Sequence, residues 1–291
     1  MVSLMSDLGD PHHSAPAIAG SDEPPPDTSP PTWGGRHDTV PWWDRFPWWA
    51  VIIAAVIAYM GYLVAFDENY NTAYDRVIPG IWITLRATVG TFAIASVLGL
   101  LLGLMRVSNN AVLRTVSRSW VEFIRGIPIL VLIFTFALVI VPELSEALGV
   151  ENRISSEWRA IIALALIYSG YIAEIFRAGF QSVDRGQVEA GRSLGLTRGQ
   201  TTRSIVMPQA VRAMIPPLGN DFIAVLKDTS LLSVLGVAEV TQRARQYSAS
   251  TFRNRDYYFA TAFIYLVLTV TLSLLVGLVE RRVTRDRRGA R

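Results

Sequence analysis

The chain has 291 residues, of which 51% are hydrophobic and only 18% are charged, and its mean hydropathy is +0.33. Because a soluble domain carries roughly 25% charged residues, this composition indicates a membrane protein. The chain has no cysteine, which excludes disulfides, zinc–thiolate clusters and thiol catalysis, and its formal net charge is only +3.

The first segment, residues 1–41, is rich in Pro, Ser, Asp and Gly and has few apolar clusters. Such a segment buries too little apolar surface to offset its ordering entropy, so we expect a disordered extension. His12 and His13 are adjacent, but a metal site needs more ligands than two. An aromatic group follows and favours an interfacial belt where the chain enters a membrane; it comprises Trp42, Trp43, Phe46, Trp48 and Trp49.

The remaining chain predicts an all-α integral membrane protein with about six transmembrane helices. A long acidic segment precedes the first apolar stretch, which argues against a cleaved signal peptide. The fifth stretch is weaker than the others and studded with polar residues. The predicted spans are residues 48–66, 81–105, 127–141 with an extension to 148, 160–180, 214–237 and 257–278.

Arginine placement predicts the orientation, because cytoplasmic loops carry an excess of basic residues. Three arginine-rich segments fall on one side, which places both termini in the cytoplasm. One loop disagrees, since Arg243, Arg245, Arg253 and Arg255 would lie outside, but moving it inward would remove a span. The three clusters are Arg106, Arg114, Arg118 and Arg125; Arg185, Arg192, Arg198, Arg203 and Arg212; and Arg281, Arg282, Arg285, Arg287, Arg288 and Arg291.

A polar stretch between the fourth and fifth spans predicts two short helices around a tight corner. Asp184 and Gln187 have the spacing of a capping box, which opens the first helix. Gly195 supplies a left-handed position that ends it. Thr197 and Gln200 repeat the box and open the second helix.

The second short helix is expected to end at Pro208, because proline cannot continue a helix. In isolation, residues 184–208 would also suit a helix-turn-helix that reads DNA. Only a few residues join this stretch to a span at each end, so its second helix could not clear the bilayer and enter a DNA groove. A membrane-tethered DNA-binding regulator is therefore excluded, and we expect no nucleic-acid partner.

On the predicted cytoplasmic side, this stretch resembles the EAA loop of ABC importer permeases. That loop has Glu-Ala-Ala, three residues, Gly, nine residues, Ile, one residue and Leu-Pro. Gly replaces the last Ala here and Met replaces Leu, changes that are small or conserve volume. The matching residues are Glu189, Ala190, Gly191, Gly195, Ile205, Met207 and Pro208.

Further segments resemble the polar amino acid (histidine/glutamine/glutamate-type) branch of that family; they are residues 123–130, 171–177, 216–220 and 226–231. Ile127 stands where the usual pattern has Thr. The resemblance implies a type I ABC importer permease (MetI-like) fold. It divides the chain into four parts. Residues 1–41 are a cytoplasmic extension, and residues 42–79 are an extra first helix with an external loop. Residues 80–282 are the permease domain, and residues 283–291 are a basic cytoplasmic tail.

The resemblance implies a permease subunit that moves polar amino acids from an extracytoplasmic binding protein across a bacterial plasma membrane. An ABC ATPase dimer on other chains would bind the ATP and Mg²⁺. Lys227, the sole lysine, follows Leu226, so this chain has no phosphate-binding loop. No catalytic residue, metal or cofactor is expected here. The residues expected to couple to the ATPase are Glu189, Ala190, Gly191, Leu194, Gly195, Ile205 and Pro208.

Polar groups inside a span tend to face a cavity or a partner, because a central charge costs roughly 2.5–3.5 kcal/mol. Here they favour a translocation path, in which Thr229 or Ser230 caps a half-helix that meets the substrate carboxylate. The alternative is structural: Glu174 or Asp228 pairs with Lys227 or Arg177. Both stay open. The candidate path residues are Glu174, Asn220, Asp221, Lys227, Asp228, Thr229 and Ser230.

Two further expectations concern partners and substrate. One unit of five or six spans is too small to enclose a path, so we expect a second permease, either the same chain or a sister chain. The Arg-rich external loop slightly favours glutamate, although it would equally dock an acidic lobe of the binding protein. An ion-coupled secondary transporter is the alternative function, but it gives no reason for the spacing from Glu189 to Pro208.

Overall fold

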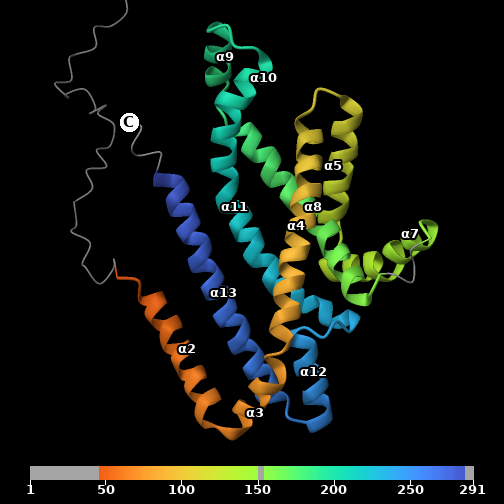
Figure 1. Ribbon diagram of the computed structural model, residues 1–291, viewed down its shortest axis with the longest axis vertical. Coiled ribbons are helices and arrows are strands. Elements are labelled where there is room, and N and C mark those ends of the chain that lie inside the picture. The colour runs from red at the N-terminus through yellow and green to blue at the C-terminus, as the bar shows by residue number, and fades with distance from the viewer. Residues whose placement is uncertain (1–45, 150–153, 286–291) are drawn as a thin grey trace, which may run out of the picture. The chain divides into compact units, whose positions relative to one another are not determined.

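The computed structural model describes residues 46–149 and 154–285 of the chain (Figure 1). The regular elements in these ranges are all helical, which confirms the predicted all-α class. The predicted disordered extension, residues 1–41, lies outside the described residues, as does most of the predicted basic tail.

Five helical segments within the described ranges are long and apolar enough to cross a membrane, and each matches a predicted span. Shorter helices connect them. The five are α2 (Trp48–Phe66), α4 (Gly80–Val107), the run Ile129–Ala147, α8 (Ser156–Gln181) and α13 (Asn254–Arg285, of which Asn254–Val283 is the candidate span). The run Ile129–Ala147 consists of α6 (Ile129–Thr135), the π-helix η1 (Phe136–Ile140) and α7 (Val141–Ala147).

The connecting helices lie toward two opposite ends of these segments (Figure 1). The α4–α5 turn, α9, α10 and the last turns of α13 lie toward one end, whereas α3 and α12 lie toward the other. The described parts of the three arginine-rich segments thus lie toward one end, as the sequence predicted. These helices are α3 (Glu68–Val77), α5 (Ala111–Gly126), α9 (Arg185–Ser193), α10 (Arg198–Thr201) and α12 (Val240–Thr251).

The predicted fifth span, residues 214–237, was placed about seven residues too late. The helix that runs between the two ends is α11 (Met207–Asp228), and it continues as the 3₁₀-helix η4 (Thr229–Leu235). It packs between α8 and α13 (Figure 1). Among the described residues α11 is not one of the five apolar segments, so a sixth passage stays a prediction that the course of α11 between the two ends favours.

The prediction that a helix ends at Pro208 was wrong. A π-helical turn, η3 (Thr202–Val206), joins α10 to α11, and Pro208 sits in the first turn of α11. The Met207 N–H bonds to the Thr202 carbonyl oxygen, five residues earlier. We attribute the passage of the proline to this wider turn, because π-bulges relax the hydrogen-bonding register that a proline would break.

The core lies along α8, whose Ile161, Leu164 and Ile167 are fully buried. Helix α4 packs closely against it through Gly99 and Gly103. A Cβ on Gly99 would lie 2.6 Å from the Ile172 Cγ2 atom, so only glycine permits this approach without a shift. These small residues therefore allow the two helices to pack closely.

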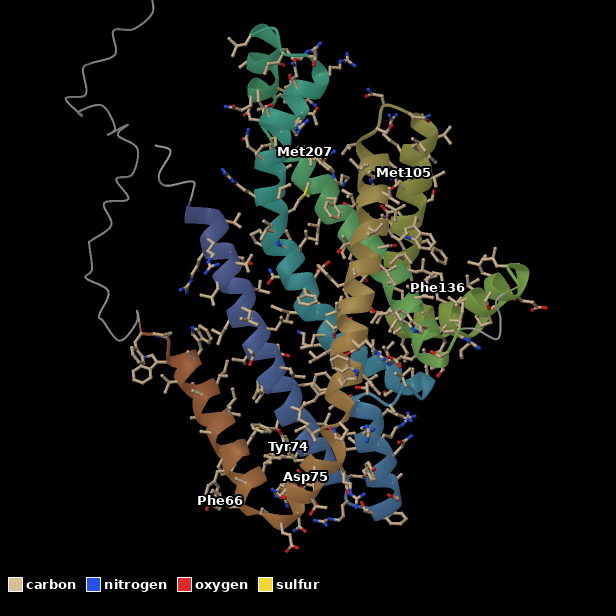
Figure 2. All side chains as sticks on the ribbon, in the orientation of Figure 1. Phe66, Tyr74, Asp75, Met105, Phe136 and Met207 are labelled. Carbon is tan, nitrogen blue, oxygen red and sulfur yellow. The ribbon has the colours of Figure 1, made fainter. Side chains whose placement is uncertain are left out.

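A second core joins α3, α12 and α13. The rings of Tyr70 and Phe259 lie 4.8 Å apart between centroids, and those of Tyr74 and Phe263 lie 6.2 Å apart. Figure 2 places Tyr74 and Asp75 toward the end opposite Met105 and Met207. This core closes the end of the molecule that lies away from α9 and α10.

Candidate functional site: the α9–α10 hairpin and the polar face of α11

The hairpin begins at Asp184, which caps α9 by accepting a hydrogen bond from the Gly186 N–H (2.6 Å). The Gln187 N–H bonds to the Asp184 carbonyl oxygen (3.1 Å). Within the described part of the chain, the reciprocal side-chain bond from Gln187 is not formed. Asp184 is thus a simple N-cap, and the predicted capping box is only half right.

The corner of the hairpin is a complete Schellman turn, which confirms the predicted left-handed glycine. Gly195 has φ +84°, and its N–H bonds to the Arg192 carbonyl oxygen (3.0 Å). The Leu196 N–H bonds to the Gly191 carbonyl oxygen (3.2 Å). These two bonds satisfy the last carbonyls of α9 and set the direction in which the chain leaves it.

The second helix, α10, opens with the predicted capping box. The Thr197 hydroxyl accepts from the Gln200 N–H (3.4 Å), and the Gln200 Oε1 accepts from the Thr197 N–H (2.9 Å). Both helix ends at the corner therefore have their backbone groups paired by nearby residues. A rigid, locally determined hairpin follows from this pairing.

The hairpin folds onto η3 at Gly191, which is buried. A Cβ there would lie 2.5 Å from the Ile205 Cδ1 atom, so glycine at the third position of the Glu-Ala-Ala pattern lets Ile205 pack against α9. In contrast, Leu194 is 84% exposed, and no atom lies within 4 Å of the Cβ position of Gly195. Glu189 and Ala190 are also exposed, so the corner presents an uncovered apolar tip.

The polar residues of α11 and η4 fall into different environments. The Tyr168 hydroxyl donates to the Asp228 Oδ2 atom (2.8 Å). Thr229 is fully buried, and its hydroxyl donates to the Leu226 carbonyl oxygen (2.6 Å). The expected capping role of Thr229 was therefore wrong, because α11 continues directly into η4 and leaves no new helix start to cap.

Lys227 is exposed and lines a groove of about 430 Å³ with Ser230, Tyr265, Leu266 and Thr269. This groove brings together a cation and three hydroxyl groups, from α11, η4 and α13. Asn220 and Asp221 lie two turns earlier on α11.

Asn220 is exposed, and the Asp221 Oδ2 atom is buried. Within the part of the chain that the structure describes, this Oδ2 atom has no hydrogen-bond partner. A buried carboxylate oxygen without a partner is costly, so it requires water, a ligand or another chain. Asn220, Lys227 and Ser230 form a polar face of α11 and η4, whereas Asp221 points about 100° around the helix from Asn220.

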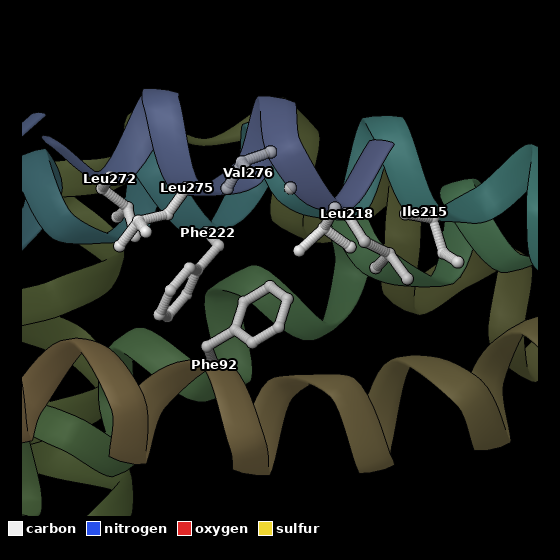
Figure 3. A pocket seen from close by; sticks show the side chains of 9 residues that line it. Phe92, Ile215, Leu218, Phe222, Leu272, Leu275 and Val276 are labelled. Atoms are coloured by element: carbon white, nitrogen blue, oxygen red, sulfur yellow. The ribbon is translucent and has the colours of Figure 1, made fainter. Parts of the chain in front are cut away.

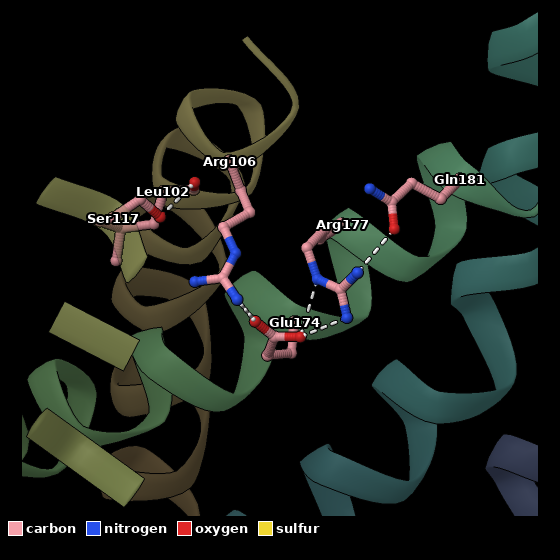
Figure 4. A network of polar contacts seen from close by, with 6 residues as sticks. All are labelled: Leu102, Arg106, Ser117, Glu174, Arg177 and Gln181. Atoms are coloured by element: carbon pink, nitrogen blue, oxygen red, sulfur yellow. Dashed lines mark hydrogen bonds and ion pairs between the residues drawn. The ribbon is translucent and has the colours of Figure 1, made fainter. Parts of the chain in front are cut away.

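Glu174 lies in an ion cluster that joins α4 to α8 (Figure 4). Its carboxylate pairs with the Arg106 Nη2 atom (3.0 Å) and the Arg177 Nη2 atom (2.7 Å). The Arg177 Nη1 atom donates to the Gln181 Oε1 atom (2.6 Å). These contacts favour the structural pairing of Glu174 with Arg177 that the sequence left open, although Arg106 is a partner that the sequence did not suggest.

A further carboxylate, Glu239, was missed by reasoning from the sequence. It is fully buried outside the apolar spans and caps α12, accepting from the Thr241 N–H (2.8 Å) and the Gln242 N–H (2.7 Å). The Tyr265 hydroxyl also donates to it (2.9 Å). Burial raises the pKa of Glu239 to about 7, although these hydrogen bonds lower it. Glutamate is not a preferred N-cap, so the sequence carried no signal for this site.

A second groove lies between α4, α11 and α13 and has entirely different chemistry (Figure 3). Phe92 and Phe222 face each other across it, with ring centroids 4.9 Å apart. It is lined by Phe92, Ile215, Leu218, Gly219, Phe222, Leu272, Leu275, Val276 and Val279. Because these side chains are apolar, this groove offers a polar solute no hydrogen bond.

Comparison with known proteins relates this arrangement to transport. Residues 95–285 match the model of the family described as binding-protein-dependent transport system inner membrane component. The probable amino-acid permease protein YxeN of Bacillus subtilis is 37% identical over 221 residues, which cover 76% of this chain and 97% of that protein. The glutamine transport system permease protein GlnP of Escherichia coli K12 is 37% identical over 211 residues, covering 72% and 94%.

A solved structure of an amino acid ABC transporter with histidines superposes on this fold with a TM-score of 0.64. The aligned regions are 37% identical and cover 73% of this chain and 95% of that chain. The fold and the sequence thus point to the same group of proteins.

Proposed function

Because the chain belongs to the family of binding-protein-dependent transport system inner membrane components, we propose that polar amino acids cross the membrane along its α11 face. The chain is a multi-pass permease subunit of an amino-acid ABC importer and not an enzyme. ATP and Mg²⁺ bind to a separate ATPase chain. The substrate arrives from an extracytoplasmic binding protein, and both termini lie in the cytoplasm.

The observation that carries the proposal is the continuity between the hairpin and the polar face. The uncovered Leu194 tip, together with Glu189, docks in a groove of the ATPase dimer. The capping hydrogen bonds at both ends of its corner hold the hairpin together, so it moves as a unit. It passes through η3 into α11 without a break, so a displacement at the tip turns α11 as a rigid body.

A second permease closes the path. Lys227 is exposed on α11, and it forms no ion pair with the residues that the structure describes. An ammonium group that faces hydrocarbon is costly, so its side of α11 faces water or another polar surface. We assign that surface to a second permease, the same chain or a sister chain, with the polar faces of both lining the path.

The substrate is a polar amino acid. The charges of the external loop bear on whether glutamate is favoured over a neutral amino acid. The Arg245 Nη2 atom donates to the Ser233 carbonyl oxygen (3.2 Å), and Arg253 pairs with Asp256 (2.8 Å). Arg253 is thus paired with a carboxylate within the fold, whereas Arg245 bonds to a neutral carbonyl and keeps its charge, so one of the four arginines of the external loop is compensated within the described part of the chain. Glutamine and glutamate are therefore the two substrates to compare.

The direct test is uptake by proteoliposomes that contain the permease, its co-purified ATPase and its binding protein. We expect uptake of labelled glutamine or glutamate that requires internal ATP and the binding protein. Vesicles without ATP, or with an ATPase-inactive partner, provide the control. Uptake driven by a proton or sodium gradient without the ATPase would instead support the ion-coupled secondary transporter.

The polar face is tested by Lys227→Met and Asp228→Asn, singly and together. Asp228 already bonds to Tyr168, so its carboxylate does not depend on Lys227. We expect each single variant to lower uptake and the double variant not to restore it. Recovery in the double variant would show that the two residues pair with each other, and it would remove them from the path. Thermal unfolding of each variant checks that the fold is retained.

A further inference from the structure

We propose that the pocket between the ends of α4 and α5 binds the phosphate of an anionic phospholipid. This pocket of about 250 Å³ is lined by Arg106, Arg114, Thr115 and Arg118. Its lining residues come from α4 and α5, and the turn between these helices lies toward the same end as the α9–α10 hairpin (Figure 1). The proposal does not depend on the transport function, since it concerns a contact between this chain and its membrane.

The first argument is the uncompensated charge of the pocket. Arg106 pairs with Glu174, but Glu174 is shared with Arg177, so one carboxylate serves two guanidinium groups. Arg114 and Arg118 form no ion pair within the described part of the chain. They are one helical turn apart and therefore face the same side of α5. Three guanidinium groups thus meet with less than one full counter-charge, which favours binding of an anion.

The second argument is a buried donor without an acceptor. Arg106 is only 17% exposed, and its Nη1 atom is buried without a hydrogen-bond partner among the described residues. In Figure 4 this terminal nitrogen points away from Glu174. A buried guanidinium N–H costs free energy unless an acceptor reaches it. An oxygen of a bound anion in the pocket supplies that acceptor.

The donors available in the pocket suit a phosphate group. The Thr115 hydroxyl already donates to the Ala111 carbonyl oxygen (2.9 Å), so the arginines carry the recognition. Arg114 uses one nitrogen on the Ser108 carbonyl oxygen (2.9 Å) and keeps its others, and Arg118 has no hydrogen bond within the described part of the chain. Planar guanidinium groups pair with phosphate oxygens through two parallel hydrogen bonds, which an ammonium group cannot do.

The position of the pocket selects a lipid over a soluble anion. Helix α4 has 28 residues and is about 42 Å long, whereas the hydrocarbon layer is about 30 Å thick. Arg106, in its last turn, therefore lies at the depth of lipid headgroups. Exposed apolar side chains lie on other faces of the same turns of both helices, where acyl chains would contact these helix ends; they are Leu104, Val107, Val112, Leu113 and Val116.

The test is native mass spectrometry of the full chain in detergent, titrated with phosphatidylglycerol or with phosphatidylcholine of the same acyl chains. The variant is Arg114→Gln/Arg118→Gln, which leaves the Arg106–Glu174 pair intact. The matched control is Arg281→Gln/Arg282→Gln, which removes two exposed charges from α13 at the same end. Thermal unfolding verifies that both variants fold. A further variant, Arg114→Lys/Arg118→Lys, retains the positive charges but lacks the planar guanidinium groups that form two parallel hydrogen bonds.

We expect the unmodified chain to bind phosphatidylglycerol at least about tenfold more tightly than phosphatidylcholine, since each charged hydrogen bond contributes about that factor. The glutamine variant should lose this preference, the lysine variant should keep part of it, and the α13 control should keep most of it.

Equal binding of both lipids, or an equal loss in the α13 control, would overturn the proposal. Displacement of the lipid by inorganic phosphate alone would assign the pocket to a soluble anion. Displacement by the ATPase, with weaker ATPase binding in the glutamine variant, would make the pocket a protein contact.

Discussion

At the scale of single residues, two glycines four positions apart do different work in the hairpin. Gly191 is buried, and a Cβ there would lie 2.5 Å from the Ile205 Cδ1 atom, so the end of that side chain would have to move aside. Gly195 has open space around it, but its φ of +84° lies where residues with a side chain are strained. The first glycine thus allows close packing, whereas the second is required by the backbone conformation.

This difference predicts the result of a substitution at the corner. Gly195→Val places a β-branched residue at positive φ, at a cost of roughly 2 kcal/mol, so the Schellman turn should shift or open. We expect ATP hydrolysis without matching uptake, measured as the ratio of the two rates in proteoliposomes. Gly199→Val is the control, because its Cβ also meets no atom within 4 Å but its φ is not positive. Full coupling in Gly195→Val would contradict the prediction.

The buried Glu239 predicts a pH dependence of stability. Its pKa is about 7 in the folded protein and about 4.5 when exposed, so the folded state binds more protons between these values. The stability that the protonated group contributes is complete below pH 4.5 and is lost as the pH rises through 7. Between pH 5 and 8, the melting temperature of the unmodified chain should fall more than that of Glu239→Gln, which does not titrate. Parallel pH profiles of the two proteins would refute this.

At the scale of elements, the continuous path α10–η3–α11 is the feature that relates the hairpin to the polar face. Pro208 has no N–H to donate, and the π-turn before it shifts the hydrogen-bonding register so that the helical path continues. Because no loop interrupts this path, the tip of the hairpin and the start of α11 cannot move independently. The hairpin and α11 therefore transmit a displacement to the membrane spans only if a partner binds the tip of the hairpin.

This arrangement predicts that Leu194 anchors the ATPase. Leu194→Asp places a charge on a side chain that is 84% exposed, so the fold should be unaffected while docking is weakened by about tenfold or more. Co-purification of the ATPase with the permease measures the effect. Phe252→Asp is the matched control, since Phe252 is 91% exposed and is the C-cap residue of α12, which lies toward the opposite end. Retention of the ATPase by Leu194→Asp would argue against this anchor.

At the scale of the whole molecule, α4 and α8 form the frame against which the other helices pack. An ion pair ties them near each end: Arg86 to Glu157 at one end and Arg106 to Glu174 at the other. Between these pairs, Gly99 and other small residues bring the two backbones together. Close packing supplies most of the stability of such a joint, and the partly exposed ion pairs mainly set its register.

The joint predicts a measurable difference between two glycines in membrane helices. A Cβ on Gly103 would lie 2.6 Å from the Phe176 Cβ atom and 3.2 Å from the Ala173 carbonyl oxygen, neither of which can yield without a backbone shift. Gly103→Ala should therefore destabilise the protein by roughly 1–3 kcal/mol, seen as a lower melting temperature in detergent. Gly277→Ala on α13, where no atom lies within 4 Å, should be neutral or slightly stabilising. Equal melting temperatures for the two variants would contradict this account.

The sequence by itself determined the class of the protein, five spans, the Gly195 turn, the Thr197 cap and the motif spacing in the hairpin. These features depend on hydropathy or on residues within one or two helical turns, so a local pattern contains them. Only the tertiary structure decided the partners of Glu174, the burial of Glu239 and the continuity of α11 past Pro208. Tyr168 and Asp228, for example, meet across 60 positions of sequence. Such contacts arise from how the helices pack, and no spacing along a single chain encodes them.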